Sequence, residues 1–307
     1  MGTKPAALLA ALAAAVLIAL GGASLTSAAK PTPTPSPQPP TAPPTPAGLR
    51  AGLRASDYGI RPWPSPAWWG SSIGSMAARF PGATGAMVAV VVEIDGLTGP
   101  GCWAHFPNPD GETYPGVRFD AADKFEPDFA RFDEAGIKVW LQVEPAGCDM
   151  AMLIDLVMKQ YGRHPSVIGF GVDDEWYLNR QYRGGKPITD AEAQAWVALT
   201  RSCNTAYRVF LKHWLTAQMP PTYRDGIVFI DDSQGFQSMT AMLAEFATWG
   251  SHFGPAPVGF QFGYKTDQKS WARLADPPKT VGNGILARVA NTSDLYWVDF
   301  TARSIWP

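Results

Sequence analysis

The sequence has few of the residues that metal and redox centres use, with four histidines and three cysteines among 307 residues. No histidines stand in an HxH or HExxH spacing, so a zinc site is not favoured. No glycine-rich phosphate loop follows an apolar segment, which argues against a nucleotide-binding enzyme. The 25 basic and 27 acidic residues nearly balance and form no basic cluster. We therefore expect neither nucleic acid nor an anionic membrane surface as a partner.

The N-terminal residues have the order of a secretory signal peptide: Lys4, an apolar run over residues 6–20, and small residues up to Ala29. The apolar run is too short for a comfortable membrane span. We therefore expect residues 1–29 to be removed and the protein to be secreted, to the extracellular space or the cell envelope. An uncleaved signal anchor is the alternative.

A proline-rich segment over residues 30–48 follows, containing PTPTPSPQPPTAPPTP. This composition cannot build a helix or a ladder and predicts an extended spacer. Residues 49–307 have ordinary globular composition and are enough for one large domain. We expect this domain to be a monomer.

Three cysteines in an exported protein indicate one disulfide and one remaining thiol. Cys102 lies in the loop after the second predicted strand and Cys148 in the loop after the third. If these strands are neighbours, both loops lie at the same end of the barrel. We predict a bond between the two cysteines. Cys203 stands in step with Trp196 and Leu199 on a predicted helix and is expected to be free and buried.

Apolar, often β-branched segments alternate with helical patterns along the domain. Helix signals include Pro127 in a first turn, Asp149 as an N-cap and a capping box at residues 189–192. The connection over residues 215–225 contains two prolines and is predicted to be a loop or a short helical turn. Eight alternating units predict a single (β/α)8 TIM barrel of the α/β class. The predicted strands cover residues 53–59, 87–95, 137–144, 167–175, 208–214, 227–232, 258–262 and 295–300.

The segment IGFGVDDEWY, residues 168–177, is the most informative part of the chain. In a strand, its isoleucine, phenylalanine and valine point one way, while two glycines, Asp173 and Glu175 point the other. An apolar outer face suits packing against helices, and the opposite face suits the interior of a barrel. Because buried acids are costly unless they have a function, this strand end predicts a catalytic or binding site.

The same alternation places polar residues of other strands at the carboxyl end of the barrel, where TIM-barrel active sites lie. Asp231 and Asp232 end the sixth strand, and the pattern does not decide which of them points inward. A water-filled mouth with ion pairs around Lys212 is the alternative to an active site. The residues expected to face inward are Glu93, Trp140, Gln142, Glu144, Lys212, Trp214 and Gln261.

Crowded carboxylates push one another's pKa values apart, so that one remains protonated while another is ionised. Cleavage of a glycosidic bond needs such a pair. Our hypothesis is that Glu175 is the general acid, Asp173 orients it, and Glu144 or Asp231 is the partner carboxylate. Aromatic rings and polar groups around them would bind a sugar substrate. The predicted substrate-binding residues are Trp176, Trp214, Lys212, Gln142, Gln261, Trp297, Asp232 and Glu93.

The motif GVDDEW, residues 171–176, resembles the Asp-x-Glu of Chalaropsis-type lysozymes and more loosely the Asp-x-Asp-x-Glu of chitinase-type barrels. The lysozyme resemblance implies further aspartates on the first strand and on a late strand, which would be Asp57 and either Asp231 or Asp232. The chitinase pattern expects a glutamate where this chain has Tyr177. Retaining cellulase-type barrels carry a glutamate at the seventh strand end, which here reads QFGY. The resemblance implies a secreted glycoside hydrolase of a polysaccharide or cell-wall glycan.

Three other functions are compatible with the same residues. The acids could bind Mg²⁺ or Ca²⁺ in a metal-dependent hydrolase or lyase. The barrel could be a non-catalytic carbohydrate-binding protein of the cell envelope. Lys212 could form a Schiff base, although a lysine among acids is more often a charge partner. We expect a carbohydrate as the substrate, with no cofactor and no bound metal.

Overall fold

The computed structural model describes residues 45–96, 99 and 101–307. The predicted signal peptide, residues 1–29, and residues 30–44 of the predicted spacer lie outside the described residues. Within the described ranges, no helix combines the length and the apolar character needed to cross a membrane.

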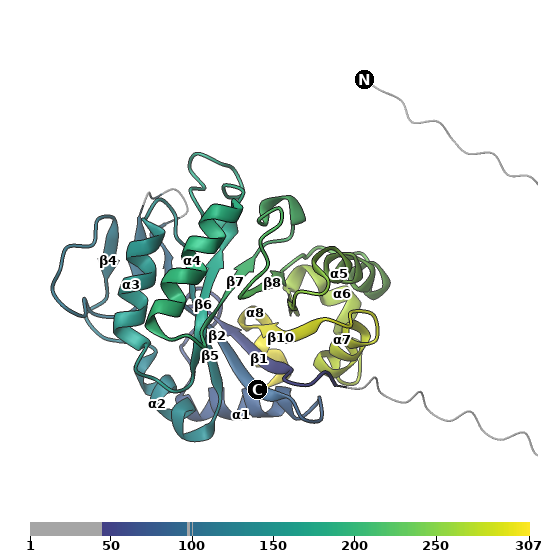
Figure 1. The fold of residues 1–307 in the computed structure, drawn as a ribbon. Coiled ribbons are helices and arrows are strands. Elements are labelled where there is room, and N and C mark those ends of the chain that lie inside the picture. The colour runs from purple at the N-terminus through teal and green to yellow at the C-terminus, as the bar shows by residue number, and fades with distance from the viewer. Residues whose placement is uncertain (1–44, 97–98, 100) are drawn as a thin grey trace, which may run out of the picture. The chain divides into compact units, whose positions relative to one another are not determined.

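Eight parallel strands of the described residues form a closed barrel (Figure 1). The barrel closes because the first strand pairs with both the second and the last, which confirms the predicted (β/α)8 TIM barrel. The eight strands are β1 (Arg50–Ala55), β2 (Thr84–Ile94), β5 (Lys138–Val143), β6 (Val167–Asp173), β7 (Arg208–Lys212), β8 (Ile227–Asp231), β9 (Val258–Phe262) and β10 (Thr292–Val298).

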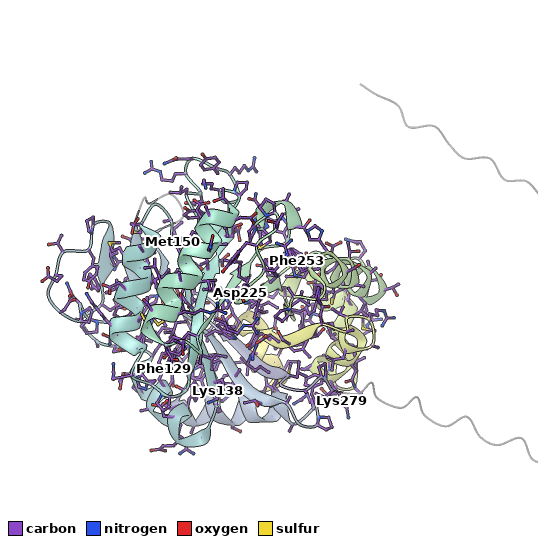
Figure 2. All side chains as sticks on the ribbon, viewed as in Figure 1. Phe129, Lys138, Met150, Asp225, Phe253 and Lys279 are labelled. Atoms are coloured by element: carbon purple, nitrogen blue, oxygen red, sulfur yellow. The ribbon has the colours of Figure 1, made fainter. Side chains whose placement is uncertain are left out.

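Helices cover the outside of the barrel, with α2, α3 and α4 on one side and α5, α6 and α7 on the other (Figure 1). Side chains such as Phe129 and Phe253 fill the space between helices and strands (Figure 2). The helices are α1 (Pro66–Ala77), α2 (Glu126–Ala135), α3 (Met150–Tyr161), α4 (Asp190–Cys203), α5 (Met239–Phe253), α6 (Gln268–Trp271), α7 (Pro277–Leu286) and α8 (Asp299–Ile305).

The predicted helix signals operate as the sequence indicates. Asp149 accepts a hydrogen bond from the backbone N–H of Met152 at the start of α3, and Thr189 and Glu192 form the capping box of α4. The connection after β7 contains only a 3₁₀ turn, η2 (Thr216–Gln218), as its prolines predicted. Two short strands, β3 (Cys102–Ala104) and β4 (Val117–Phe119), extend the sheet in the loop after β2.

The first strand begins and ends earlier than predicted. β1 stops at Ala55 because the next backbone N–H, that of Ser56, donates 2.6 Å to the side chain of Asp299 instead of continuing the ladder. The last strand also ends early, at Val298, because Asp299 opens α8. The hydrogen bond that ends β1 joins residues far apart in the chain, and local propensity does not contain it.

A bulge in β2 changes which of its residues face the barrel interior. Val88 was expected to point outward, but it packs inside the barrel with Ala86 and Trp140. The register with β5 shifts by one residue between Val90 and Val92, so the alternation reverses there. Glu93 therefore faces the barrel mouth and Val92 the outer core, as predicted, whereas the predicted direction of Val88 was wrong.

The inward-facing glycines of β6 make room for large rings inside the barrel. A Cβ atom on Gly171 would lie 2.1 Å from the Phe210 ring, which is fully buried. We expect Gly171→Ala to lower the free energy of unfolding by about 1–3 kcal/mol through overpacking, measured by urea denaturation. Gly70→Ala in α1 is the matched control, since its Cβ would meet nothing within 4 Å. If Gly171→Ala were as stable as the control, this packing role would be refuted.

The structure brings the sulfurs of the predicted cysteine pair together, at a separation longer than the ~2.05 Å of a disulfide bond. The sulfurs of Cys102 and Cys148 lie 2.7 Å apart and both thiols are free, so the disulfide stays a prediction. Cys203 is also free, but it is exposed rather than buried. The buried residues of α4 are Ala193, Trp196, Val197 and Thr200, whereas Cys203 is the last residue of the helix, at its exposed end.

Candidate active site

A pocket of about 430 Å³ opens at the carboxyl end of the barrel, the usual place of a TIM-barrel active site. Each of the eight strands supplies at least one lining residue, near its end or just after it. In strand order from β1 to β10, these are Arg54, Glu93, Glu144, Asp173, Lys212, Asp232, Tyr264 and Phe300.

Glu175 lies at the pocket wall in a different local structure from the one predicted. β6 ends at Asp173, and Glu175 is the middle residue of the 3₁₀ turn η1 (Asp174–Trp176). The turn leaves Glu175 half-buried against the pocket and buries Asp174 completely. Burial, together with the nearby charge of Asp173, raises the pKa of Glu175 to about 7. Such a carboxyl can carry and release a proton near neutral pH.

Lys212 lies between two buried carboxylates. Its ammonium is 2.9 Å from Asp173 and 2.5 Å from Asp232, and Gln142 donates a hydrogen bond of 3.2 Å to Asp173. Burial would lower the pKa of Lys212, but the charges of the two aspartates outweigh it and hold that pKa well above its ordinary value. Lys212 therefore stays charged and stabilises negative charge beside it.

Glu144 is the deepest carboxylate on the other side of the pocket, with 1% of its surface exposed. It accepts hydrogen bonds from the Tyr58 hydroxyl, at 2.5 Å, and from the Ile94 backbone N–H, at 3.2 Å. The Arg54 guanidinium lies 3.9 Å away. Burial and the charge of Asp173 nevertheless raise the pKa of Glu144 to about 8. Its environment thus differs from that of Glu175, whose side chain forms no hydrogen bond with any of the described residues.

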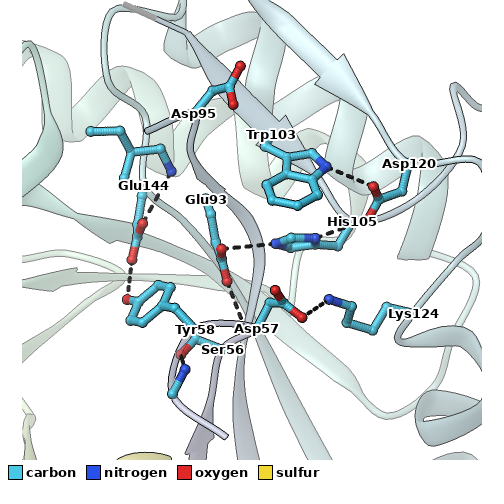
Figure 3. Close-up of polar contacts among 12 residues, drawn as sticks. Ser56, Asp57, Tyr58, Glu93, Asp95, Trp103, His105, Asp120, Lys124 and Glu144 are labelled. Atoms are coloured by element: carbon cyan, nitrogen blue, oxygen red, sulfur yellow. Dashed lines mark hydrogen bonds and ion pairs between the residues drawn. The ribbon is translucent and has the colours of Figure 1, made fainter. Parts of the chain in front are cut away.

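Glu93 is held by a buried histidine that the sequence analysis did not identify (Figure 3). His105 is fully buried, with Nε2 3.2 Å from Glu93 and Nδ1 3.1 Å from Asp120. Trp103 packs against the imidazole and donates to Asp120 at 2.8 Å. The signal available in the sequence was the spacing of Trp103, on the short strand β3, and His105, just after that strand.

The structure places the predicted site residues in three groups. Glu93, Glu144, Asp173, Glu175, Trp176, Lys212 and Asp232 line the pocket. Gln142 and Gln261 are fully buried and do not line it. Trp214, Asp231 and Trp297 do not line it.

Of the two aspartates at the end of β8, the pocket contains Asp232. Ile230 packs inside the barrel, so the next residue, Asp231, points to the outer side, where it accepts a 2.8 Å hydrogen bond from the Ser233 backbone N–H. Trp297 was expected at the rim but is fully buried in the outer core, packed against Trp271. Its ring faces the helices because alternation along β10 places Tyr296 inside the barrel.

The lining residues that were missed include Arg54, Tyr58, Tyr264 and Phe300. Arg54 was missed because the first strand was placed too late, although Arg50, Gly52 and Arg54 alternate with apolar residues. The others lie just after strand ends, where the chain turns and alternation no longer gives a direction.

Asp57, which the lysozyme resemblance would place in the site, does not line the pocket. Its side chain pairs with Arg61 and Lys124, and these cations lower its pKa even though burial acts to raise it. Among the described residues, no three His, Cys, Asp or Glu side chains are arranged to hold a metal ion.

No protein-family model and no curated protein matches the chain. Similar solved structures include an FMN-binding beta-glucuronidase from Facaelibacterium prausnitzii L2-6, with 13% identity, a TM-score of 0.41, and 59% of this chain and 31% of that chain covered. A beta-glucuronidase of Parabacteroides merdae has 13% identity and a TM-score of 0.37, covering 59% and 26%. Beta-glucuronidase 3 of Bacteroides uniformis has 16% identity and a TM-score of 0.32, covering 52% and 20%. The chain spans less than a third of these proteins' lengths, so the function is inferred from the pocket alone.

Proposed function

We propose that the protein is a glycoside hydrolase in which Glu175 is the general acid. The observation that carries this proposal is a half-buried carboxyl, with a pKa raised to about 7, at the wall of a pocket that contains further carboxylates. Glycosidic bond cleavage requires one carboxyl that gives a proton and a second carboxylate nearby. Aromatic lining residues, among them Trp103 and Trp176, suit stacking against the apolar faces of a sugar.

In the proposed reaction, Glu175 gives its proton to the glycosidic oxygen as the bond from that oxygen to the anomeric carbon breaks. Positive charge develops on the sugar ring and is stabilised by a partner carboxylate. Water then forms the new C–O bond at the anomeric carbon, and its proton returns to Glu175, directly or through the partner carboxylate and solvent, so that the enzyme is restored. Glu144 is the partner in our hypothesis, while Asp173, held at 2.9 Å by Lys212, is the competing candidate now that Asp231 lies outside the pocket.

The proposed function is tested by release of reducing sugars from a panel of neutral, amino-sugar and acidic polysaccharides. Activity that survives EDTA supports carboxylate catalysis, whereas activity lost to EDTA and restored by Mg²⁺ or Ca²⁺ would favour the metal-dependent alternative. Binding to a polysaccharide without any release of sugar would favour the carbohydrate-binding alternative. Secretion, also part of this proposal, is tested by the N-terminal sequence of the protein recovered from the medium.

The pH dependence of kcat/KM distinguishes the two partner carboxylates. Glu175 must be protonated, so activity falls as the pH rises through about 7. If the ionised partner is Glu144, with a pKa of about 8, activity also falls as the pH decreases below that value. The profile is then a bell with its maximum between the two values. If Asp173 is the partner, the acidic limb follows the pKa of Asp173 instead, which burial raises above its ordinary value against the lowering effect of the Lys212 charge. Activity that rises steadily through pH 8 would refute the role of Glu175.

A further inference from the structure

A second pocket, of about 400 Å³, adjoins the first along the barrel rim. Three residues, Glu175, Asp232 and Gln234, line both pockets. Glu175 therefore lies at the boundary between the two pockets. A general acid that protonates the glycosidic oxygen between two sugar rings must lie at such a boundary. The second pocket is completed by Trp214, Leu215, Ser233, Phe236 and Glu245.

Both candidate partner carboxylates lie on one side of Glu175. Glu144 and Asp173 line the first pocket and not the second. Since positive charge develops on the ring that keeps the anomeric carbon, that ring belongs in the first pocket. We propose that the second pocket binds the leaving-group part of the substrate, an inference that rests on the proposed function. The sugar that this pocket accepts is uncharged or carries an amino group.

The aromatic surface of this second pocket is fixed before any ligand arrives. The Trp214 ring stacks on the His213 ring, with centroids 4.0 Å apart. The His213 imidazole accepts a 2.9 Å hydrogen bond from the Leu215 backbone N–H, and its other nitrogen lies 2.9 Å from the Gly184 carbonyl. One nitrogen therefore accepts and the other donates, which is the neutral tautomer. A held, half-buried tryptophan loses little freedom when a sugar ring stacks on it.

The charge of the second pocket restricts the kind of sugar it accepts. Glu175, Asp232 and Glu245 are acids, and none of its described lining residues is a lysine or an arginine. Burial lowers the pKa of His213, so that ring adds no positive charge at neutral pH. A carboxylate or sulfate on the leaving-group sugar would meet the Glu245 carboxylate, with no lysine or arginine among the described lining residues to balance it, which is unfavourable at short range. The exposed Leu215 and half-buried Phe236 add apolar contact.

The experiment compares substrates that do and do not fill the second pocket. The probes are tetrasaccharides of glucose, N-acetylglucosamine, mannose and xylose, together with the glycosyl fluorides of the same sugars. A fluoride leaving group is a single atom and reaches no part of Trp214. We expect Trp214→Ala to lower kcat/KM on the cleaved tetrasaccharide by about 10-fold and to leave the fluoride within about twofold. Trp214→Phe, which keeps a ring, should retain most of the activity on the tetrasaccharide.

Trp68→Ala is the matched control, because Trp68 is half-buried on α1 and lines neither pocket. Equal losses on tetrasaccharide and fluoride, or no loss on the tetrasaccharide, would overturn the inference and leave the proposed function standing. A wild-type protein that hydrolyses neither kind of substrate would overturn the proposed function and this inference with it. Thermal melting of each variant separates a local effect from unfolding.

The charge preference has its own measurement. Free glucosamine is expected to inhibit hydrolysis of the tetrasaccharide more strongly than glucuronic acid does at equal concentration. Glu245→Lys, which changes a residue of the second pocket alone, should narrow or reverse this order. Stronger inhibition of the wild type by glucuronic acid would overturn the assigned sugar class.

Discussion

Glu175→Gln is expected to slow hydrolysis of a sensitive polysaccharide by about 10²–10⁴-fold, the usual contribution of a general acid or base. Glutamine keeps the size of the side chain and its place in η1, but it has no proton to give to the leaving oxygen. Since the pockets on both sides remain, binding of the oligosaccharide should persist. Initial rates of reducing-sugar release and isothermal titration measure the two quantities separately.

A leaving group that needs no protonation provides an internal check. Glycosyl fluorides depart without a strong acid, so Glu175→Gln should recover much of its activity on them. Glu134→Gln is the matched control, because Glu134 lies on α2 with 72% of its side chain exposed. Turnover of Glu175→Gln close to that of the control on the polysaccharide would refute the assignment.

Lys212→Met is expected to lower the free energy of unfolding by about 3–5 kcal/mol, the cost of removing one partner from a buried charge pair. The lysine, Asp173 and Asp232 side chains are only 5%, 2% and 6% exposed. Methionine fills the space but leaves two carboxylates facing each other without a cation. Urea denaturation at pH 7 measures the loss.

The destabilisation should depend on pH in a definite direction. Burial already raises the pKa of Asp173 in the folded protein, and without the lysine that pKa rises further above the unfolded value of about 3.9. When the pKa of a carboxyl is higher in the folded protein than in the unfolded one, the free energy of unfolding falls as the pH rises from the unfolded pKa towards the folded pKa. The difference between wild type and variant should therefore be larger at pH 8 than at pH 5.

Two comparisons test whether charge causes this effect. Adding Asp173→Asn and Asp232→Asn to the Lys212→Met variant removes the uncompensated charges and should recover part of the stability. Lys159→Met removes a lysine whose two carboxylate partners lie at the surface and should change the unfolding midpoint far less. An equal loss for Lys159→Met and Lys212→Met, or a loss independent of pH, would contradict the proposed role of the buried pair.

The sequence by itself determined the barrel. The signals that predicted it each depend on residues close together in the chain. They are the alternating strand and helix patterns, the caps at Asp149 and Thr189, and the proline-rich connection after β7. Such features can therefore be predicted from local sequence patterns, and the structure has all eight strands close to their predicted positions. Strand alternation also put Glu144 and Lys212 on the pocket side, because the side-chain period of a strand is fixed by the backbone.

Only the tertiary structure decided the details at the pocket wall. The bulge in β2 arises from pairing with β5, and the early end of β1 arises from Asp299. The turn η1 set the exposure of Glu175. His105 reaches Glu93 from a position just after β3, a short strand that the sequence patterns did not predict. Side-chain direction is a local property only inside a regular strand, and the residues that line this pocket lie where the strands end. There, contacts between distant segments fix the direction of each side chain, and no periodicity in the sequence records them.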